Sequence, residues 1–327
     1  MIPRVTTTLV GLLLAAFLST TTAQPLPDAM PFQERQCIKR GWHVLMLDIG
    51  AIPRRILWKG PEGVWPRGAI IVMHGGGGHH FQFCVANART LAPQVKFTEL
   101  AVTKGFAVFL LESSDRVTDN EGLPCGKVWD DEVRDRPNLD LPFIGTVIRT
   151  IIPNARPPGS SEAVFLTGLS SGGYMTLRAA THFGNLITAF APISSGDPYG
   201  WHRVCEKGRS TRKTVHGLGY DNETGKQIIE PGACYAKNHI NEKPWDGKDI
   251  VPKPIFQAFH HRYDGINDLS CMEKAITQLR KHDYPEVSAF LLDGNRRRSL
   301  GNHFWQDAYN EPLLEFFTRQ LRPQQVP

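Results

Sequence analysis

The stretch that decides the fold is Ala163–Gly173, which reads AVFLTGLSSGG. Its first five residues are apolar or β-branched, as in a buried strand. The next five, Gly168–Gly172, match the pattern G-x-S-x-G, and helical spacing follows from Ser171 to Phe183. A strand, a tight turn bearing a serine and a helix together indicate a nucleophile elbow. Because glycines on both sides let the strand and the helix approach each other, Ser170 is the predicted nucleophile.

Apolar runs outside this stretch predict further strands of one sheet. Ala69–Met73 (AIIVM) and Phe106–Leu111 (FAVFLL) contain no polar side chain, which is typical of strands buried on both faces. Strands that alternate with helices indicate an α/β fold with a mostly parallel sheet and helices on both faces. With the elbow, this pattern predicts the α/β-hydrolase fold. The other predicted elements are strands at Ile255–Phe259 and Ser288–Leu292 and helices at Met272–Lys281 and Glu311–Leu321.

A glycine-rich segment, His74–Gly78, directly follows the first of these strands. In α/β-hydrolases this position supplies a backbone N–H group that stabilises the oxyanion of the reaction. We expect that donor to be Gly76 or Gly77, and the second donor to be the N–H group of Ser171. A phosphate-binding loop is the rival interpretation, but the Lys-Ser/Thr pair of a P-loop is absent.

Metal chemistry is not predicted. His79 and His80 could form a metal pair, but no acidic residue accompanies them at helical spacing. No CxxC or Cys/His spacing suggests a zinc site either. The sequence predicts no metal and no organic cofactor.

A serine nucleophile needs a histidine base, which comes last in the order of this fold. His303 lies in a loop after the predicted strand Ser288–Leu292. His260 and His261 are competitors, but they end a strand or follow it directly, which favours a structural role. His303 is therefore the predicted base.

The acid that orients the base is expected between nucleophile and base in the chain. Asp264 lies just past the predicted strand Ile255–Phe259, in a loop that can reach His303. Asp268 is the main competitor and Asp293 the third candidate. Asp264 is the predicted acid.

The region from about residue 195 to residue 252 breaks the alternation of strands and helices. It is rich in Gly, Pro, Lys and Trp and too long for an ordinary connection, so we expect a lid-like insertion over the sheet. Trp201 and Trp245 in this insertion, and Trp305 beside the base, are predicted to bind substrate. The insertion aromatics could equally pin the insertion to the body of the domain.

The N-terminus reads as a secretory signal. Arg4 precedes a short apolar run at 10–18, and small residues lead to Ala23. We expect cleavage after Ala23, which leaves a single catalytic domain over residues 24–327. An uncleaved anchor is the alternative. A secreted protein, extracellular or periplasmic, is therefore predicted.

The six cysteines are an even number, which in an exported protein favours disulfide bonds. We expect Cys205 to pair with Cys234, because both lie in the insertion. Closing that loop of about 28 residues would stabilise the fold by roughly 3–4 kcal/mol. The other pairings stay open.

The composition is that of a globular domain, with 41% hydrophobic and 21% charged residues. The net charge is +5, and its basic residues are mostly scattered, with small clusters at 207–213 and 296–298. Such clusters are typical of solvated surface, so nucleic acid is not an expected partner. No stretch after the N-terminus is apolar enough to span a membrane.

These motifs resemble the secreted esterases of the polyhydroxybutyrate depolymerase and feruloyl esterase type, over roughly Arg54–Phe317. The resemblance implies Ser170 as nucleophile, Asp264 as acid and His303 as base. His261 and Asn302 stand where the family has glycines. The matching segments are AIIVMHGGGG at 69–78, Asp140–Ile144, GLSSGGYM at 168–175, Ala191-Pro192, His260–Asp264 and Gly301–Trp305.

The predicted reaction is ester hydrolysis through an acyl-enzyme on Ser170. A polyester, such as a polyhydroxyalkanoate, or an aromatic plant-wall ester, such as a feruloylated sugar, is the expected substrate. Two alternatives stay open. One is a serine peptidase, because Ser171–Thr176 also resembles the elbow of prolyl-oligopeptidase-type enzymes; the other is a non-catalytic binding protein on the same fold.

Overall fold

The structure is a computed structural model, and it describes residues 30–118, 125–134, 136–199, 245 and 250–321. It also describes the backbone of two strands at 215–220 and 227–232. The chain divides into two units, Met1–Met30 and Pro31–Pro327. The fold described below is that of the second unit.

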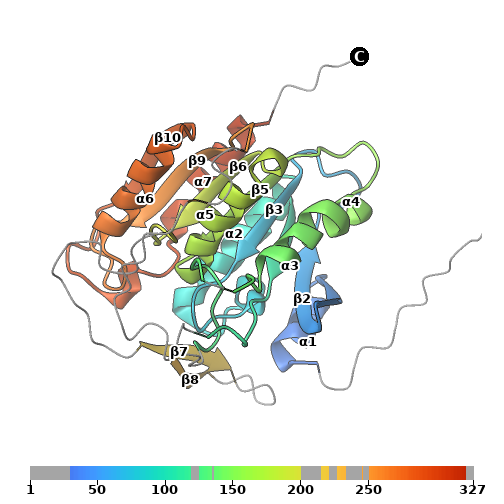
Figure 1. The fold of residues 1–327 in the computed structure, drawn as a ribbon. Helices are drawn as coiled ribbons and strands as arrows, with labels where there is room; N and C mark the ends of the chain where they lie inside the picture. The colour runs from blue at the N-terminus through green and yellow to red at the C-terminus, as the bar shows by residue number, and fades with distance from the viewer. Residues whose placement is uncertain are drawn as a thin grey trace, which may run out of the picture. The chain divides into compact units, whose positions relative to one another are not determined.

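The main sheet has eight strands in the order β1-β2-β4-β3-β5-β6-β9-β10 (Figure 1). β2 pairs antiparallel with both β1 and β4. Every pair in the remaining series, β4-β3-β5-β6-β9-β10, is parallel. This order, with one antiparallel strand before a parallel series, confirms the predicted α/β-hydrolase fold. The strands are β1 (His43–Ile49), β2 (Ile52–Lys59), β3 (Ala69–Met73), β4 (Ala107–Leu111), β5 (Val164–Leu169), β6 (Ala189–Ile193), β9 (Ile255–His261) and β10 (Glu286–Leu292).

Helices cover both faces of the sheet. In Figure 1, α3, α5 and α6 lie in front of it, and they share one hydrophobic core with the sheet; α2 and α7 belong to a second core. The helices are α1 (Phe32–Lys39), α2 (Ala92–Thr103), α3 (Leu141–Thr146), α4 (Ile152–Ala155), α5 (Ser171–His182), α6 (Leu269–Lys281) and α7 (Asp307–Arg319). Short helical turns are η1 (His80–Phe83), η2 (Arg89–Leu91), η3 (Val147–Ile151), η4 (Gly184–Leu186) and η6 (Leu300–Asn302).

Alternation along the central strands separates the two cores. Ile71 and Met73 of β3 lie in the core with α5, whereas Ile70 and Val72 lie in the core with α2 and α7. All five residues of β3 are therefore buried, which explains the uninterrupted apolar run in the sequence. At about 25 cal/mol per Å² of buried apolar surface, these two cores supply the main favourable term in folding.

The predicted insertion lies largely outside the described residues. Within it the structure describes a two-stranded antiparallel sheet, β7 (Val215–Tyr220) and β8 (Gln227–Gly232). The predicted cleavage after Ala23 also lies outside the described residues. Among the residues that are described, no helix is long and apolar enough to cross a bilayer.

One disulfide bond joins Cys37 of α1 to Cys84 just after η1, with 5.7 Å between their Cα atoms. Cys125 and Cys271 are disulfide-bonded as well. The predicted pair of Cys205 and Cys234 lies outside the described residues. The Cys37–Cys84 bond fastens the N-terminal helix to the segment that follows the glycine-rich loop.

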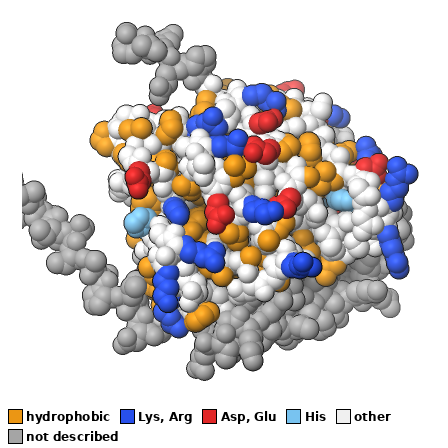
Figure 2. All heavy atoms as spheres, turned by 180° about the vertical axis from the view of Figure 1, so that it is seen from behind, with side chains coloured by type: hydrophobic (Ala, Val, Ile, Leu, Met, Phe, Trp, Pro, Cys, Tyr) orange, Lys and Arg blue, Asp and Glu red, His pale blue; other side chains and the backbone are white. Residues whose placement is uncertain are grey.

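Figure 2 shows basic and acidic side chains interspersed on the face that it displays. Two solvent-accessible ion pairs join α2 and the residue that follows it to α7: Lys96 Nζ lies 2.8 Å from Asp307 Oδ2, and Lys104 Nζ lies 2.9 Å from Glu311 Oε2. Exposed pairs of this kind contribute about 0–1 kcal/mol each. They therefore add little to the packing of α2 against α7.

Candidate active site

Ser170 occupies a sharp turn between β5 and α5, where its backbone has φ 54° and ψ −117°. A positive φ is unfavourable for a residue with a side chain, so the surrounding structure must hold it. The Ser170 N–H group donates to Ile193 O at 2.9 Å, and Ser170 O accepts from the Tyr174 N–H group at 2.9 Å. These two bonds fix the turn to β6 and to the first turn of α5. The partly exposed hydroxyl projects from the end of the sheet.

The glycines of the elbow permit close backbone contacts. A Cβ atom on Gly168 would lie 2.4 Å from Gly172 O, and one on Gly172 would lie 2.3 Å from Met73 O. Both distances are shorter than any real carbon–oxygen contact, so side chains at these positions would force the backbone apart. The small residues predicted from the G-x-S-x-G pattern are therefore required by the packing of α5 against β3 and β5.

His303 lies just after η6 and pairs with Asp264, which follows β9. Its Nδ1 atom is 2.8 Å from Asp264 Oδ2 and 3.0 Å from Asp264 Oδ1. Asp264 Oδ1 also accepts from the N–H groups of Ile266 and Asn267 at 2.7 and 2.9 Å. Burial would raise the pKa of Asp264, but the His303 and His260 rings and these N–H groups outweigh it and lower the pKa. The carboxylate is therefore ionised and fixed against Nδ1, which leaves Nε2 of His303 as the second ring nitrogen.

The competing residues have other partners. Asp268 forms an ion pair with Arg298, and Asp293 is exposed. His260 is fully buried, its Nε2 atom lies 3.2 Å from Asn267 O, and burial lowers its pKa to about 4. His261 Nδ1 accepts from the Tyr263 N–H group at 3.0 Å. The structure therefore brings Asp264, and neither of the other two carboxylates, against His303.

A single pocket brings the predicted residues together at the end of the sheet. Ser170 and His303 both line it, together with the glycine-rich loop that follows β3. The predicted nucleophile, the predicted base and the glycine-rich loop therefore border the same pocket. The described residues that line the pocket are Gly75, Gly76, Gly77, Gly78, Gln82, Thr90, Leu91, Gln94, Leu169, Ser170, His303 and Phe304.

The two candidate oxyanion glycines differ in their hydrogen bonds. The Gly77 N–H group donates to Lys127 O at 2.6 Å, and Gly77 has a φ of 70°. The described part of the chain provides no such acceptor for the Gly76 N–H group. Of the two, Gly76 is the donor that a substrate oxygen can use without breaking an existing bond.

Residues 127–131 connect the two halves of this site, and no motif in the sequence indicated them. Trp129 Nε1 donates to His74 O at 2.9 Å, at the start of the glycine-rich loop. The Trp129 N–H group donates to Ser171 Oγ at 3.0 Å, and Ser171 Oγ donates to Asp131 Oδ2 at 2.9 Å. Ser171 is thus bonded through one segment to the loop that carries Gly76. The one feature of the sequence that could have indicated this role is a tryptophan, Trp129, in an otherwise polar stretch.

Glu112 directly follows β4 and pairs with His79 and His80, the two histidines that were considered as a metal pair. Glu112 Oε1 lies 2.7 Å from His79 Nδ1, and Glu112 Oε2 lies 2.6 Å from His80 Nδ1. Burial would raise the pKa of Glu112, but Lys127, His80 and His79 lower it well below its usual range. Across the described residues, no group of three His, Cys, Asp or Glu side chains could hold a metal ion.

The predicted substrate-binding tryptophans do not line the pocket where they are described. Trp305 is 1% exposed and packs against Phe83 and Phe97, so its predicted contact with substrate is corrected to a core position. Trp245 stacks on Tyr199 and His282, which agrees with the alternative that it pins the insertion.

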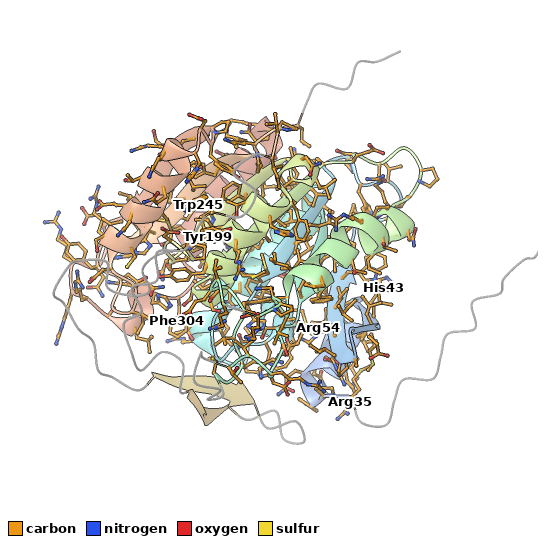
Figure 3. The ribbon with its side chains drawn as sticks, viewed as in Figure 1. Arg35, His43, Arg54, Tyr199, Trp245 and Phe304 are labelled. Atoms are coloured by element: carbon orange, nitrogen blue, oxygen red, sulfur yellow. A yellow bond between two sulfur atoms is a disulfide. The ribbon has the colours of Figure 1, made fainter. Side chains whose placement is uncertain are left out.

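Trp201 lies outside the described residues. Figure 3 shows Trp245 beside Tyr199, and Phe304 apart from both. Phe304 is the aromatic side chain that does line the pocket. It directly follows the predicted base, so its position in the sequence could have indicated this role.

No protein-family model and no curated protein sequence matches the chain. Solved structures do resemble it at low sequence identity. A lipase/esterase from Lactobacillus plantarum is 12% identical, with a TM-score of 0.51 over 85% of this chain and 98% of that one. An acylaminoacyl peptidase from Pyrococcus horikoshii is 14% identical, with a TM-score of 0.52 over 88% of this chain and 42% of that one.

A thermostable esterase is 14% identical, with a TM-score of 0.50 over 86% of this chain and 63% of that one. The chain thus spans less than two thirds of both this esterase and the peptidase. At these identities the likeness is one of fold, and it agrees with the strand order described above.

Proposed function

We propose that the chain is a serine hydrolase that cleaves carboxylic esters through an acyl-enzyme on Ser170. The observation that carries this proposal is the pair of His303 and Asp264, which faces the same pocket as a serine in a strained elbow. A buried carboxylate on Nδ1 fixes the imidazole tautomer in which Nε2 can accept a proton.

In the first step His303 Nε2 takes the proton of the Ser170 hydroxyl as its oxygen attacks the ester carbonyl. The N–H groups of Ser171 and Gly76 stabilise the oxyanion that forms, and one such donor contributes about 10²–10³ in rate. His303 then gives the proton to the leaving alcohol. In the second step it takes a proton from water, which attacks the acyl-enzyme and releases the acid. The mechanism uses no metal ion and no cofactor.

Export and a polymeric or aromatic ester complete the proposal. The four disulfide-bonded cysteines outside the insertion (Cys37 with Cys84, and Cys125 and Cys271) support an oxidising compartment, in which disulfides persist. The resemblance to polyhydroxybutyrate depolymerases and feruloyl esterases supports a polyester or a feruloyl ester as substrate. Phe304 in the pocket wall is compatible with an aromatic or extended acyl group.

A peptidase is the second candidate, because one solved structure of similar fold is an acylaminoacyl peptidase. A panel of polyhydroxybutyrate, methyl ferulate, short p-nitrophenyl esters and peptide amides separates the two enzymes. We expect release from esters and none from amides; hydrolysis of amides at rates equal to esters would favour the peptidase.

The test of the nucleophile is Ser170→Ala together with labelling by a fluorophosphonate. The wild-type chain should be labelled, and Ser170→Ala should lose the label and about 10⁶ in kcat. An unlabelled wild-type chain that hydrolyses no ester would favour the alternative of a non-catalytic binding protein. Near-normal ester hydrolysis by Ser170→Ala would overturn the assignment of Ser170.

A further inference from the structure

Gln94 is a buried polar residue in the pocket, and neither the motifs nor the mechanism uses it. It lies in the first turn of α2 and is 2% exposed. Its Oε1 atom is buried and has no hydrogen-bond partner among the described residues. The pocket that holds Ser170 and His303 is bounded by this side chain.

A buried carbonyl oxygen without a partner is costly, by about 1–3 kcal/mol. Such an atom in a core is a defect, but in a binding pocket a ligand can supply the missing donor. Gln82, the other glutamine of this pocket, differs because its Oε1 atom accepts from the His79 N–H group at 3.2 Å. Gln94 is therefore the glutamine whose carbonyl is available to a bound group.

The rest of the pocket restricts what that group can be. His303 is the ionisable side chain of the described lining, which contains no Asp, Glu, Lys or Arg. The lining therefore offers no fixed counter-charge to an ammonium or a carboxylate group. Leu91 and Leu169 supply apolar walls beside the amide. An uncharged group that donates a hydrogen bond and sits on a short carbon chain fits these surroundings.

We propose that Gln94 forms a specificity subsite for a hydroxyl group carried by the ester, within a few bonds of the scissile carbonyl. This inference rests on the proposed ester hydrolysis. The hydroxyl donates to Gln94 Oε1, and a substrate that lacks it leaves the carbonyl buried and unpaired. A site of this kind discriminates against the analogue without the hydroxyl.

The hydroxyl can belong to the acyl part or to the alcohol part, and paired substrates distinguish them. The acyl pair is p-nitrophenyl 3-hydroxybutyrate and p-nitrophenyl butyrate. The alcohol pair is 2-hydroxyethyl butyrate and ethyl butyrate. In one pair we expect the wild-type chain to show a kcat/KM about 5- to 150-fold higher for the hydroxylated ester, because a lost bond of this kind is worth roughly 1–3 kcal/mol.

The variant Gln94→Met keeps the length of the side chain and removes its hydrogen-bonding groups. It should lose the preference for the hydroxylated ester, so that the ratio of kcat/KM values within the pair falls to about one. Gln257→Met is the matched control, because Gln257 is also buried with an unpartnered Oε1 atom but lies on β9 and does not line the pocket. The control should keep the preference.

Two results would overturn the proposal. The first, which needs no variant, is a wild-type chain that shows no preference in either pair. The second is a Gln94→Met variant that keeps the preference. Failure of the underlying function looks different. A chain that neither reacts with a fluorophosphonate nor hydrolyses the plain esters refutes the serine hydrolase itself. Labelling and plain-ester hydrolysis without a hydroxyl preference refute the Gln94 subsite alone.

Discussion

Replacing Gly172 with alanine is the sharpest test of how the candidate site is built. The added Cβ would lie 2.3 Å from Met73 O and 2.5 Å from His74 O. Both atoms belong to the backbone at the end of β3, so no side-chain rotation can relieve the contacts. An ordinary carbon–oxygen contact needs more than 3 Å, so β3 and α5 must separate by up to about 1 Å, and overpacking of this kind costs about 1–3 kcal/mol.

The same separation would disturb the proposed oxyanion hole. Gly76 follows β3 and Ser171 begins α5, so a shift between these elements moves their two N–H groups apart. Loss of one donor lowers kcat by about 10²–10³. For a chain of this length the unfolding entropy is about 0.6 kcal/mol per kelvin, so a cost of about 2 kcal/mol lowers Tm by about 3 °C.

The assay is urea unfolding together with kcat for p-nitrophenyl butyrate. Gly294→Ala is the control, because a Cβ on Gly294 meets nothing within 4 Å. It should change neither quantity. The reasoning is refuted if Gly172→Ala unfolds at the same urea concentration as the wild-type chain and keeps its kcat, since the close contact between α5 and β3 would then be absent.

Two further predictions follow from the buried polar groups. Trp129→Phe removes the N–H group that donates to His74 O. We expect kcat to fall by about tenfold or more, while KM stays within about threefold of the wild-type value. A rise in KM alone would contradict a role of Trp129 in positioning the oxyanion loop. For His80, burial would lower the pKa, but Glu112 and Glu34 outweigh it and raise the pKa to about 9. Its stabilising effect is therefore complete below the ordinary pKa of 6.5 and is lost as the pH rises through 9. The wild-type chain and His80→Gln should differ in unfolding free energy by on the order of 3 kcal/mol at pH 6. This difference should shrink as the pH rises toward 9. A difference that does not depend on pH would contradict the ion pairs of His80 with Glu112 and Glu34.

The central strands and the elbow were predictable because their signal is local. β3 coincides with the predicted Ala69–Met73, and α5 ends one residue before the predicted Phe183. β1 and β2 were not predicted, because no residue of β1 is buried and the apolar residues of β2 are interrupted by Pro53, Arg54 and Arg55. A strand of that kind is recognised from its pairing partner, which a single sequence does not reveal.

The site divides in the same way between local and long-range information. Spacing along the chain was enough to nominate Ser170, Asp264 and His303. It could not show that Gly77 is bonded to Lys127 or that Trp305 is buried against Phe83, because these contacts join segments far apart in the sequence. The core position of Trp305 also shows that closeness in sequence to the predicted base did not place this tryptophan in the pocket.

Asn302 holds the loop of the predicted acid and the loop of the predicted base together. Neither His261 nor Asn302 has a positive φ, so nothing in the backbone there requires a glycine. Asn302 Nδ2 lies 2.9 to 3.0 Å from three carbonyl oxygens, those of Tyr263, Asn295 and Arg297. One side chain therefore joins the loop of the acid to the loop of the base. Two backbone N–H groups fix Asp264 within its own loop. The orientation of its carboxylate toward His303 therefore depends on how the loop of Asp264 is held against the loop of His303. Asn302 provides a link between these two loops that a glycine could not.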